Sequence, residues 1–246
     1  MLPKILKKPV NDAITKIKYM NPEARRRKVF KPFPQTFEIG TTSYCTTSCT
    51  MCPYGKKGVT EALPKGTMTM ELFRKIIDEC VQWQDSIKMI ALFSMNDPFT
   101  DRFFIERLEY VRDKCPKPKV IISTNALLMT SEKSDKLVDL IDGLTFTVAG
   151  GIVKESYEKH MPNHKYEVVM ANIDYLISLL RNNEKRLKIS NIGVNSFYCG
   201  NKEELEKNKD YWKERGVNFE QFTPILSRAS NVFPVKFDNT RFKGCK

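Results

Sequence analysis

Three cysteines lie within eight residues in the stretch Tyr44-Cys45-Thr46-Thr47-Ser48-Cys49-Thr50-Met51-Cys52-Pro53-Tyr54, directly after an extended apolar segment. Their C-x3-C-x2-C spacing lets one short loop turn three thiolates toward a common centre, and thiolates are the ligands that iron–sulfur clusters require. The loop has no fourth cysteine. A cluster bound through three irons would keep one iron open to another ligand, as catalytic metal sites do. The stretch therefore predicts an iron–sulfur site that performs chemistry.

Zinc is the alternative metal for this stretch. Cys49 and Cys52 form a C-x-x-C half-site, and a distant cysteine such as Cys199 or Cys245 could complete a tetrahedral set. Zinc ribbons normally contribute a second C-x-x-C pair, which this sequence lacks.

The two histidines offer little support for a zinc site. His160 and His164 are four residues apart, but Pro162 lies between them and argues against a helix that would align both rings. A thioredoxin-like redox pair is weaker still, because that motif begins a helix and has no third cysteine upstream.

The cysteines Cys45, Cys49 and Cys52, followed by Pro53, resemble the signature of radical S-adenosylmethionine (radical SAM) enzymes. Met51 stands where that family often has an aromatic residue. The resemblance implies a 4Fe-4S cluster whose open iron is chelated by S-adenosyl-L-methionine. It further implies an external one-electron donor, flavodoxin- or ferredoxin-like, and a 5′-deoxyadenosyl radical that abstracts hydrogen from a substrate.

Length and composition favour one α/β domain. The chain has 246 residues, of which 41% are hydrophobic, enough for one sizeable core. No run of 18 apolar residues predicts a transmembrane segment, and the N-terminus does not resemble a secretory signal. Seven cysteines, an odd number, are better explained as reduced thiols and metal ligands than as disulfides, which predicts a cytoplasmic protein.

Positive charge is concentrated at the N-terminus. Residues 1–35 carry ten Lys or Arg and two acids, so this arm holds most of the net charge of +12. Such an arm could bind nucleic acid or an anionic surface, or it could be a solvated tail that lies on the main domain. We expect three parts: a basic arm (1–35), a core barrel (36–231) and the start of a C-terminal extension (232–246).

Strand-like and helix-like segments alternate after residue 35. Six such units predict a parallel sheet with covering helices, and a partial (β/α)6 TIM-like barrel, the architecture of radical SAM enzymes, accommodates the count. The expected strands are 36–41, 86–93, 119–123, 143–148, 187–195 and 217–222, and the expected helices are 69–84, 101–115, 131–141, 166–180 and 203–215.

Ligands of parallel α/β barrels gather at the carboxyl ends of the strands. The second strand ends in Asn96-Asp97-Pro98, which resembles the family's Gly-Glu-Pro segment with glycine and glutamate replaced. In the family this segment receives the ammonium group of S-adenosylmethionine, largely through its backbone. Asn-Asp-Pro is also favourable turn chemistry without a ligand.

Further polar residues follow the third and fifth strands. Ser123 and Asn125 lie in a stretch that resembles the family's Thr-Asn-Gly and would contact the ribose or the methionine carboxylate, although such residues also cap turns. Asn195 is a candidate ribose contact or a strand-end residue satisfied by backbone. The pair Gly150-Gly151 would permit close approach of the backbone to the substrate or the nucleoside.

The C-terminal residues resemble one subgroup of the family. The stretch 224–231 is similar to the Asn-Arg-Ala-Gly segment of SPASM/twitch enzymes, whose C-terminal extension opens with a cysteine. Here the given sequence ends one residue after Cys245, and the resemblance therefore predicts an extension that is missing or truncated.

The expected activity is hydrogen abstraction from a peptide, protein or small-molecule substrate, with a peptide or protein side chain favoured. A zinc- or cluster-containing protein that binds nucleic acid through the basic arm is the alternative. Tyr19, Phe30 and Phe33 would give that arm a few stacking residues. A radical SAM enzyme that modifies RNA would combine both features.

Overall fold

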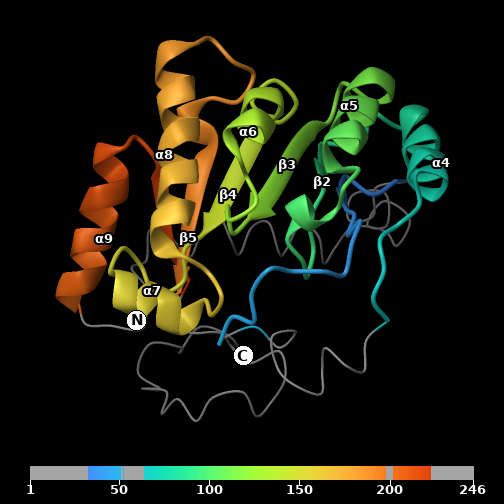
Figure 1. Ribbon diagram of the computed structural model, residues 1–246. Helices are drawn as coiled ribbons and strands as arrows, with labels where there is room; N and C mark the ends of the chain where they lie inside the picture. The colour runs from blue at the N-terminus through green and yellow to red at the C-terminus, as the bar shows by residue number, and fades with distance from the viewer. Residues whose placement is uncertain (1–32, 51, 53–63, 198–201, 223–246) are drawn as a thin grey trace, which may run out of the picture.

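A computed structural model describes residues 33–50, 52, 64–197 and 202–222. Its centre is a six-stranded parallel sheet in which the strands follow one another in chain order (Figure 1). This confirms the predicted α/β architecture. The strands are β1 (Thr36–Glu38), β2 (Met89–Ala91), β3 (Lys119–Thr124), β4 (Gly143–Thr147), β5 (Ile192–Phe197) and β6 (Asn218–Phe222).

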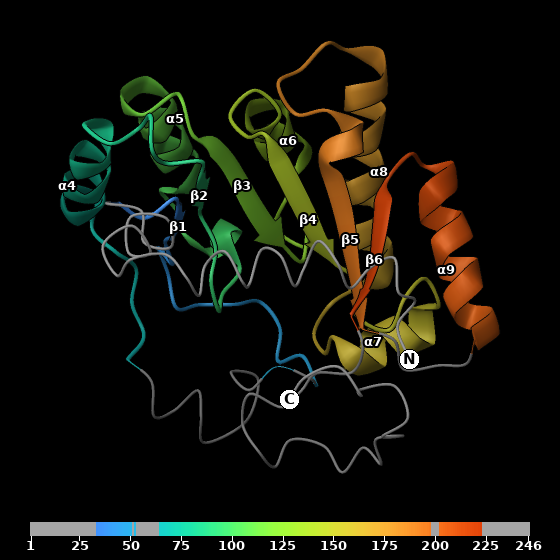
Figure 2. The same ribbon diagram turned by 180° about the vertical axis from the view of Figure 1, so that it is seen from behind.

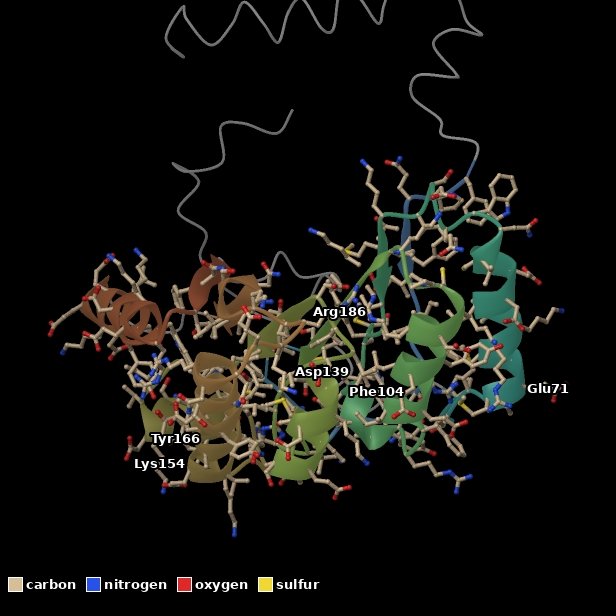
Figure 3. The ribbon with its side chains drawn as sticks, turned by 90° about the horizontal axis from the view of Figure 1, so that it is seen from above. Glu71, Phe104, Asp139, Lys154, Tyr166 and Arg186 are labelled. Carbon is tan, nitrogen blue, oxygen red and sulfur yellow. The ribbon has the colours of Figure 1, made fainter. Side chains whose placement is uncertain are left out.

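Helices connect the strands and lie along one face of the sheet, and no helix of the described residues crosses the other face (Figure 2). Seen from above, the helix layer runs from Glu71 at one end to Lys154 and Tyr166 near the other (Figure 3). The helices are α4 (Met70–Val81), α5 (Phe104–Lys114), α6 (Ser131–Leu137), α7 (Lys154–His160), α8 (Tyr166–Asn182) and α9 (Lys202–Glu214), with 3-10 turns η2 (Pro98–Thr100) and η3 (Ile189–Asn191).

Local sequence explains where α4 begins and which face it buries. Thr69 caps the helix, because its side-chain oxygen accepts a hydrogen bond from the Leu72 amide at 3.2 Å. Phe73, Ile77 and Cys80 recur at intervals of three or four residues and are buried. The predicted helix at 69–84 is therefore confirmed to within a few residues.

The two faces of the sheet differ in chemistry. Alternate residues of β3 and β5, such as Val120, Ile122 and Val194, are buried in the hydrophobic core. The opposite face of the central strands carries half-buried polar residues, and the register pairs Ser123 with Thr145 and Thr147 with Asn195. The open face is therefore suited to a polar ligand.

Several expected boundaries shift. Strands β2 and β5 are shorter than the ranges 86–93 and 187–195, and the 3-10 turn η3 occupies the start of the latter range. Helix α7 was not expected. The proposed arm (1–35) lies almost entirely outside the described residues, as does the proposed extension (232–246). No described helix has both the length and the apolar character needed to cross a membrane.

Candidate active site

The cysteine loop begins after β1 and runs past the carboxyl ends of the strands, where Figure 1 shows it in blue. Cys45 is exposed, and Cys49 and Cys52 are partly buried. The Cys52 amide donates to the Cys49 carbonyl at 3.0 Å, which forms a tight turn between these two predicted ligands. One short loop thus holds the three predicted cluster ligands.

Although Cys45 stands at an exposed position, the protein around its thiol partly shields the thiol from water and raises its pKa. Burial raises the pKa of the Cys49 thiol to about 12. Backbone amides of Thr46 and Thr47 oppose this change at Cys45. Both thiols are therefore protonated near neutral pH in the metal-free protein. Binding a metal centre would release these protons, because only thiolates act as ligands.

The three thiols are the donor type that an iron–sulfur cluster requires. Within the described residues, no three His, Cys, Asp or Glu side chains converge on a point that could hold one ion. A cubane cluster binds each thiolate through a different iron, so its sulfur ligands stand apart. Cys199 and Cys245, the proposed fourth ligands of a zinc site, lie outside the described residues. The donor chemistry therefore fits an iron–sulfur cluster.

Asp97 joins the turn after β2 to the end of β3. Its side chain is only 1% exposed and accepts three hydrogen bonds: from the Phe99 amide at 3.0 Å, and from the Thr124 hydroxyl and the Asn125 amide at 2.8 Å each. Burial raises the pKa of this carboxyl group, although the three hydrogen bonds oppose the rise. Asp97 is therefore occupied by protein donors and fixes the backbone of Asn125.

Asn96 has the opposite arrangement. Its side-chain oxygen accepts from the Ser94 amide at 3.0 Å, whereas its Nδ2 atom is buried and has no partner among the described residues. A buried amide nitrogen without an acceptor is costly. Asn96 therefore offers a donor to an acceptor group of a ligand at this edge of the sheet.

Asn125 faces the cysteine loop. Its Oδ1 accepts from the Leu127 amide at 3.1 Å, so its Nδ2 points the other way, toward the Thr46 hydroxyl at 3.0 Å and the Cys45 sulfur at 3.8 Å. The structure thus brings together Cys45, Asp97 and Asn125 from three of the predicted site segments.

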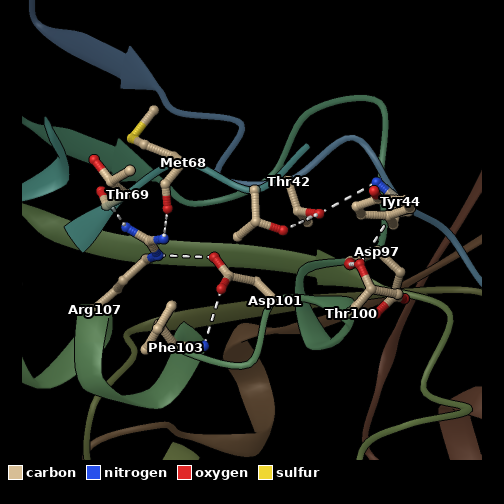
Figure 4. A network of polar contacts seen from close by, with 10 residues as sticks. Thr42, Tyr44, Met68, Thr69, Asp97, Thr100, Asp101, Phe103 and Arg107 are labelled. Carbon is tan, nitrogen blue, oxygen red and sulfur yellow. Dashed lines mark hydrogen bonds and ion pairs between the residues drawn. The ribbon is translucent and has the colours of Figure 1, made fainter. Parts of the chain in front are cut away.

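The entrance of the loop is anchored by a network on the β2 side (Figure 4). The Tyr44 carbonyl accepts from the Asp97 amide at 3.2 Å and from the Thr100 hydroxyl at 3.0 Å. Nearby, Arg107 and Asp101 form an ion pair at 2.8 Å with both side chains fully buried. Arg107 also donates to the carbonyls of Met68 and Thr69, and so holds the residues that lead into α4.

The other side of the loop is anchored by the last residue of α7 and the segment that leads from it to α8. The threonines of the loop bond to this segment through their hydroxyl groups. The contacts are Thr46 Oγ1 to His164 Nε2 at 3.0 Å, Thr47 Oγ1 to the Pro162 carbonyl at 2.9 Å, and Thr50 Oγ1 to His160 Nδ1 at 2.9 Å. The two histidines thus support the loop through its hydroxyls.

Sequence reasoning missed this role of the histidines. His164 is buried, its Nδ1 lies 3.0 Å from the hydroxyl of buried Tyr157, and burial lowers its pKa to about 4. Burial also lowers the pKa of His160. The available signal was the concentration of threonines in the loop, because hydroxyls need polar partners and the only two histidines of the chain lie within five residues of each other.

Two other predicted site features lie elsewhere. Ser123 and Asn195 are half-buried on β3 and β5, with β4 between them. The glycine pair packs closely against other residues of the protein. A Cβ atom on Gly150 would lie 2.5 Å from the Ser156 carbonyl oxygen of α7, and one on Gly151 would lie 2.6 Å from the Asn208 side chain. Positive φ angles of 82° and 77° also favour glycine there.

Comparisons with known proteins bear on the fold and on the family of this chain. The chain resembles the solved structure of native anSMEcpe with bound AdoMet, with a TM-score of 0.63 and 16% identity over 78% of this chain and 52% of that one. It also resembles methylornithine synthase (PylB), with a TM-score of 0.54 and 13% identity over 88% of this chain and 65% of that one. These likenesses show the fold, a partial TIM barrel.

The chain spans about half to two thirds of the length of these two structures. A search of curated proteins gave no match. A family profile described as "Radical SAM superfamily" matches residues 39–194, which is more than half of the chain and includes all three cysteines of the loop. The protein therefore belongs to the radical SAM superfamily, whose members use a 4Fe-4S cluster and S-adenosylmethionine.

Proposed function

We propose that Cys45, Cys49 and Cys52 hold the 4Fe-4S cluster. The observation that carries this assignment is the single loop that presents three thiols at the carboxyl edge of the sheet and is anchored on both sides. When bound and reduced, the cluster supplies the electron that splits S-adenosylmethionine into methionine and a 5′-deoxyadenosyl radical, which takes a hydrogen atom from the substrate.

We propose that S-adenosylmethionine lies along the open face of the sheet. The unpartnered Nδ2 of Asn96 would donate to an acceptor group of that molecule, and Ser123 and Asn195 would meet its polar groups from β3 and β5. Asp97 acts as a positioning residue, because its carboxylate is already bonded to three protein groups.

The proposed substrate is a peptide or protein side chain. One solved structure of the same fold, at a TM-score of 0.57 and 14% identity over 77% of this chain and 50% of that one, is anSMEcpe with AdoMet and the Cp18Cys peptide. A small molecule or an RNA is the competing substrate, and the basic arm favours the RNA. Filter binding with tRNA at several salt concentrations separates the RNA from the peptide.

Three further proposals accompany this function. The external electron donor is flavodoxin- or ferredoxin-like. The compartment is the cytoplasm, which keeps cysteines reduced. The relationship to SPASM/twitch enzymes stays a prediction, because residues 224–231 and Cys245 lie outside the described residues.

The proposed function is tested by anaerobic reconstitution with iron and sulfide, followed by dithionite and S-adenosylmethionine. We expect bound iron and sulfide, and 5′-deoxyadenosine in the product mixture. Cys49→Ala should abolish both, whereas Cys80→Ala, which removes a buried thiol of α4, should retain both. Stoichiometric zinc without iron, or equal loss in the two variants, would contradict the assignment.

A further inference from the structure

A continuous line of polar contacts connects the helix layer to a proposed cluster ligand. It runs from the Tyr157 hydroxyl to His164 Nδ1 at 3.0 Å, from His164 Nε2 to Thr46 Oγ1 at 3.0 Å, from Thr46 Oγ1 to Asn125 Nδ2 at 3.0 Å, and from Asn125 Nδ2 to Cys45 Sγ at 3.8 Å. Thr46 itself follows Cys45 in sequence. Five residues from three parts of the chain thus form one series of contacts that ends at the Cys45 sulfur.

The donor and acceptor of each contact in this line can be assigned. Tyr157 is fully buried, and within the described part of the chain its hydroxyl is bonded to His164 Nδ1. A buried hydroxyl proton needs an acceptor, so Tyr157 donates to Nδ1. A neutral imidazole that accepts at one nitrogen donates at the other, so Nε2 carries the proton and donates to Thr46. The Thr46 oxygen then accepts from both His164 and Asn125.

The remaining contacts of Asn125 fix its side chain. Its backbone amide is bonded to Asp97 and its Oδ1 accepts from the Leu127 amide, which also sets the direction of Nδ2 because the amide group is planar. The position of the Cys45 sulfur relative to Nδ2 therefore depends on where the neighbouring Thr46 hydroxyl is held. His164 and Tyr157 hold that hydroxyl.

We propose that Tyr157 and His164 are positioning residues that hold Thr46, and with it the Cys45 sulfur, beside the Asn125 amide and thereby favour the reduced cluster. This inference rests on the proposed function, in which Cys45 is a cluster ligand. An N–H group directed at a ligand sulfur stabilises the more negative, reduced state, and hydrogen bonds to sulfur are among the factors that set cluster potentials. The electron comes from the external donor, and no proton moves along the line.

The reconstituted protein provides the first test, by redox titration monitored by electron paramagnetic resonance. In Tyr157→Phe, the ratio of reduced to oxidised cluster at a fixed applied potential should fall about fivefold, as expected for one lost hydrogen bond. Tyr166→Phe is the matched control. Its hydroxyl bonds the Ile152 carbonyl at 2.8 Å and its ring contacts Tyr157, yet it stands outside the line, so the ratio should stay within about twofold.

A double-mutant cycle tests whether the effect passes through Asn125. Asn125→Leu should lower the ratio at least as much as Tyr157→Phe, and adding Tyr157→Phe to Asn125→Leu should change it no further. If Tyr157→Phe does not fold, His164 serves instead. His164→Gln keeps a donor near the Nε2 position and should retain most of the ratio, whereas His164→Leu should show the full loss.

A second readout needs no cluster. In the metal-free protein, hydrogen exchange of the backbone amides at residues 46–50 should be about fivefold faster in Tyr157→Phe than in Tyr166→Phe. Equal redox ratios and equal exchange rates in the two variants would overturn the positioning role. A wild-type protein that binds no iron would overturn the proposed function instead, and the exchange rates would still decide whether Tyr157 and His164 hold the loop.

Discussion

The two sides of the cysteine loop are anchored by different chemistry. On the β2 side, the main chain at Tyr44 is bonded next to a network that includes a fully buried ion pair, Arg107 with Asp101. On the α7–α8 side, loop hydroxyls form hydrogen bonds with the rings of His160 and His164. Burial lowers the pKa of both histidines and so favours their neutral forms. The comparison teaches that one anchor fixes where the loop starts, while the other orients the groups beside the thiols.

The largest effect is expected where the β2 anchor loses its charge balance. Arg107→Met leaves Asp101 buried without its partner and should lower the free energy of unfolding by about 3–5 kcal/mol. Urea denaturation measures this change. Arg74→Met breaks the half-exposed pair with Glu106 and should cost at most about 1 kcal/mol. Similar losses of unfolding free energy in both variants would contradict the conclusion that the buried pair contributes more than the half-exposed one.

A smaller loss is expected at Asp97. Asp97→Asn replaces one of the two accepting carboxylate oxygens with an NH2 group, so the Phe99 amide, the Thr124 hydroxyl and the Asn125 amide cannot all keep an acceptor. The free energy of unfolding should fall by about 2–3 kcal/mol, because buried donors lose their acceptor. Asp139→Asn, which affects a surface pair with Lys185, serves as the control for chemical denaturation and should stay within about 0.5 kcal/mol. An equal effect at both positions would contradict the role of Asp97.

Lowering the pH should change the stability contributed by the two anchors in opposite directions. The pKa of His164 is lowered to about 4 by burial, so the unfolded chain takes up a proton at higher pH than the folded one. Stability is therefore lost as the pH falls from about 6.5 to about 4, by about 2 kcal/mol. The pKa of Asp97 is raised by burial, so its protonation favours the folded state and acts in the opposite direction.

Chemical denaturation at several pH values between 7 and 4 measures this dependence. His164→Gln should flatten most of it, and the lowered pKa of His160 accounts for a remaining slope of the same sign. An unchanged slope in His164→Gln would show that His164 is not the group that responds to acid.

The smallest effect concerns a single loop hydroxyl. Thr47→Val keeps the shape of the side chain and removes the hydrogen bond to the Pro162 carbonyl, which should cost about 1 kcal/mol. Hydrogen exchange of the loop amides is the appropriate measurement, because the loss is local. Ser48→Ala, at the neighbouring exposed position, should leave exchange unchanged. Faster exchange in both variants would indicate that opening of the loop does not depend specifically on the hydrogen bond between Thr47 and Pro162.

Much of the fold could be predicted because its signals are local. Thr69 and the spacing of Phe73 and Ile77 indicate α4 from residues in or next to that helix. The three cysteines lie within eight residues of one another. Helix α7 was missed because its seven residues are mostly polar and only Tyr157 is buried. Seven residues are too few for a reliable apolar pattern.

The site was predicted less completely, because its contacts join distant residues. Asn96 and Asp97 were grouped as contacts of one ligand, but only the fold shows that Asp97 is already bonded to Thr124 and Asn125 while the Asn96 nitrogen is unpartnered. The role of His164 depends on a contact with Thr46 across 118 residues. Sequence spacing carries no information about such a contact between distant residues.

That separation also bears on the order of assembly during synthesis. At about 5–20 residues per second, the ribosome adds His164 roughly 6–24 s after Thr46. Throughout this interval the thiols are present while at least one of the two supports of their loop is still unmade. Iron delivered early would meet a partly supported loop, so loading of the proposed cluster should follow completion of the fourth β/α unit.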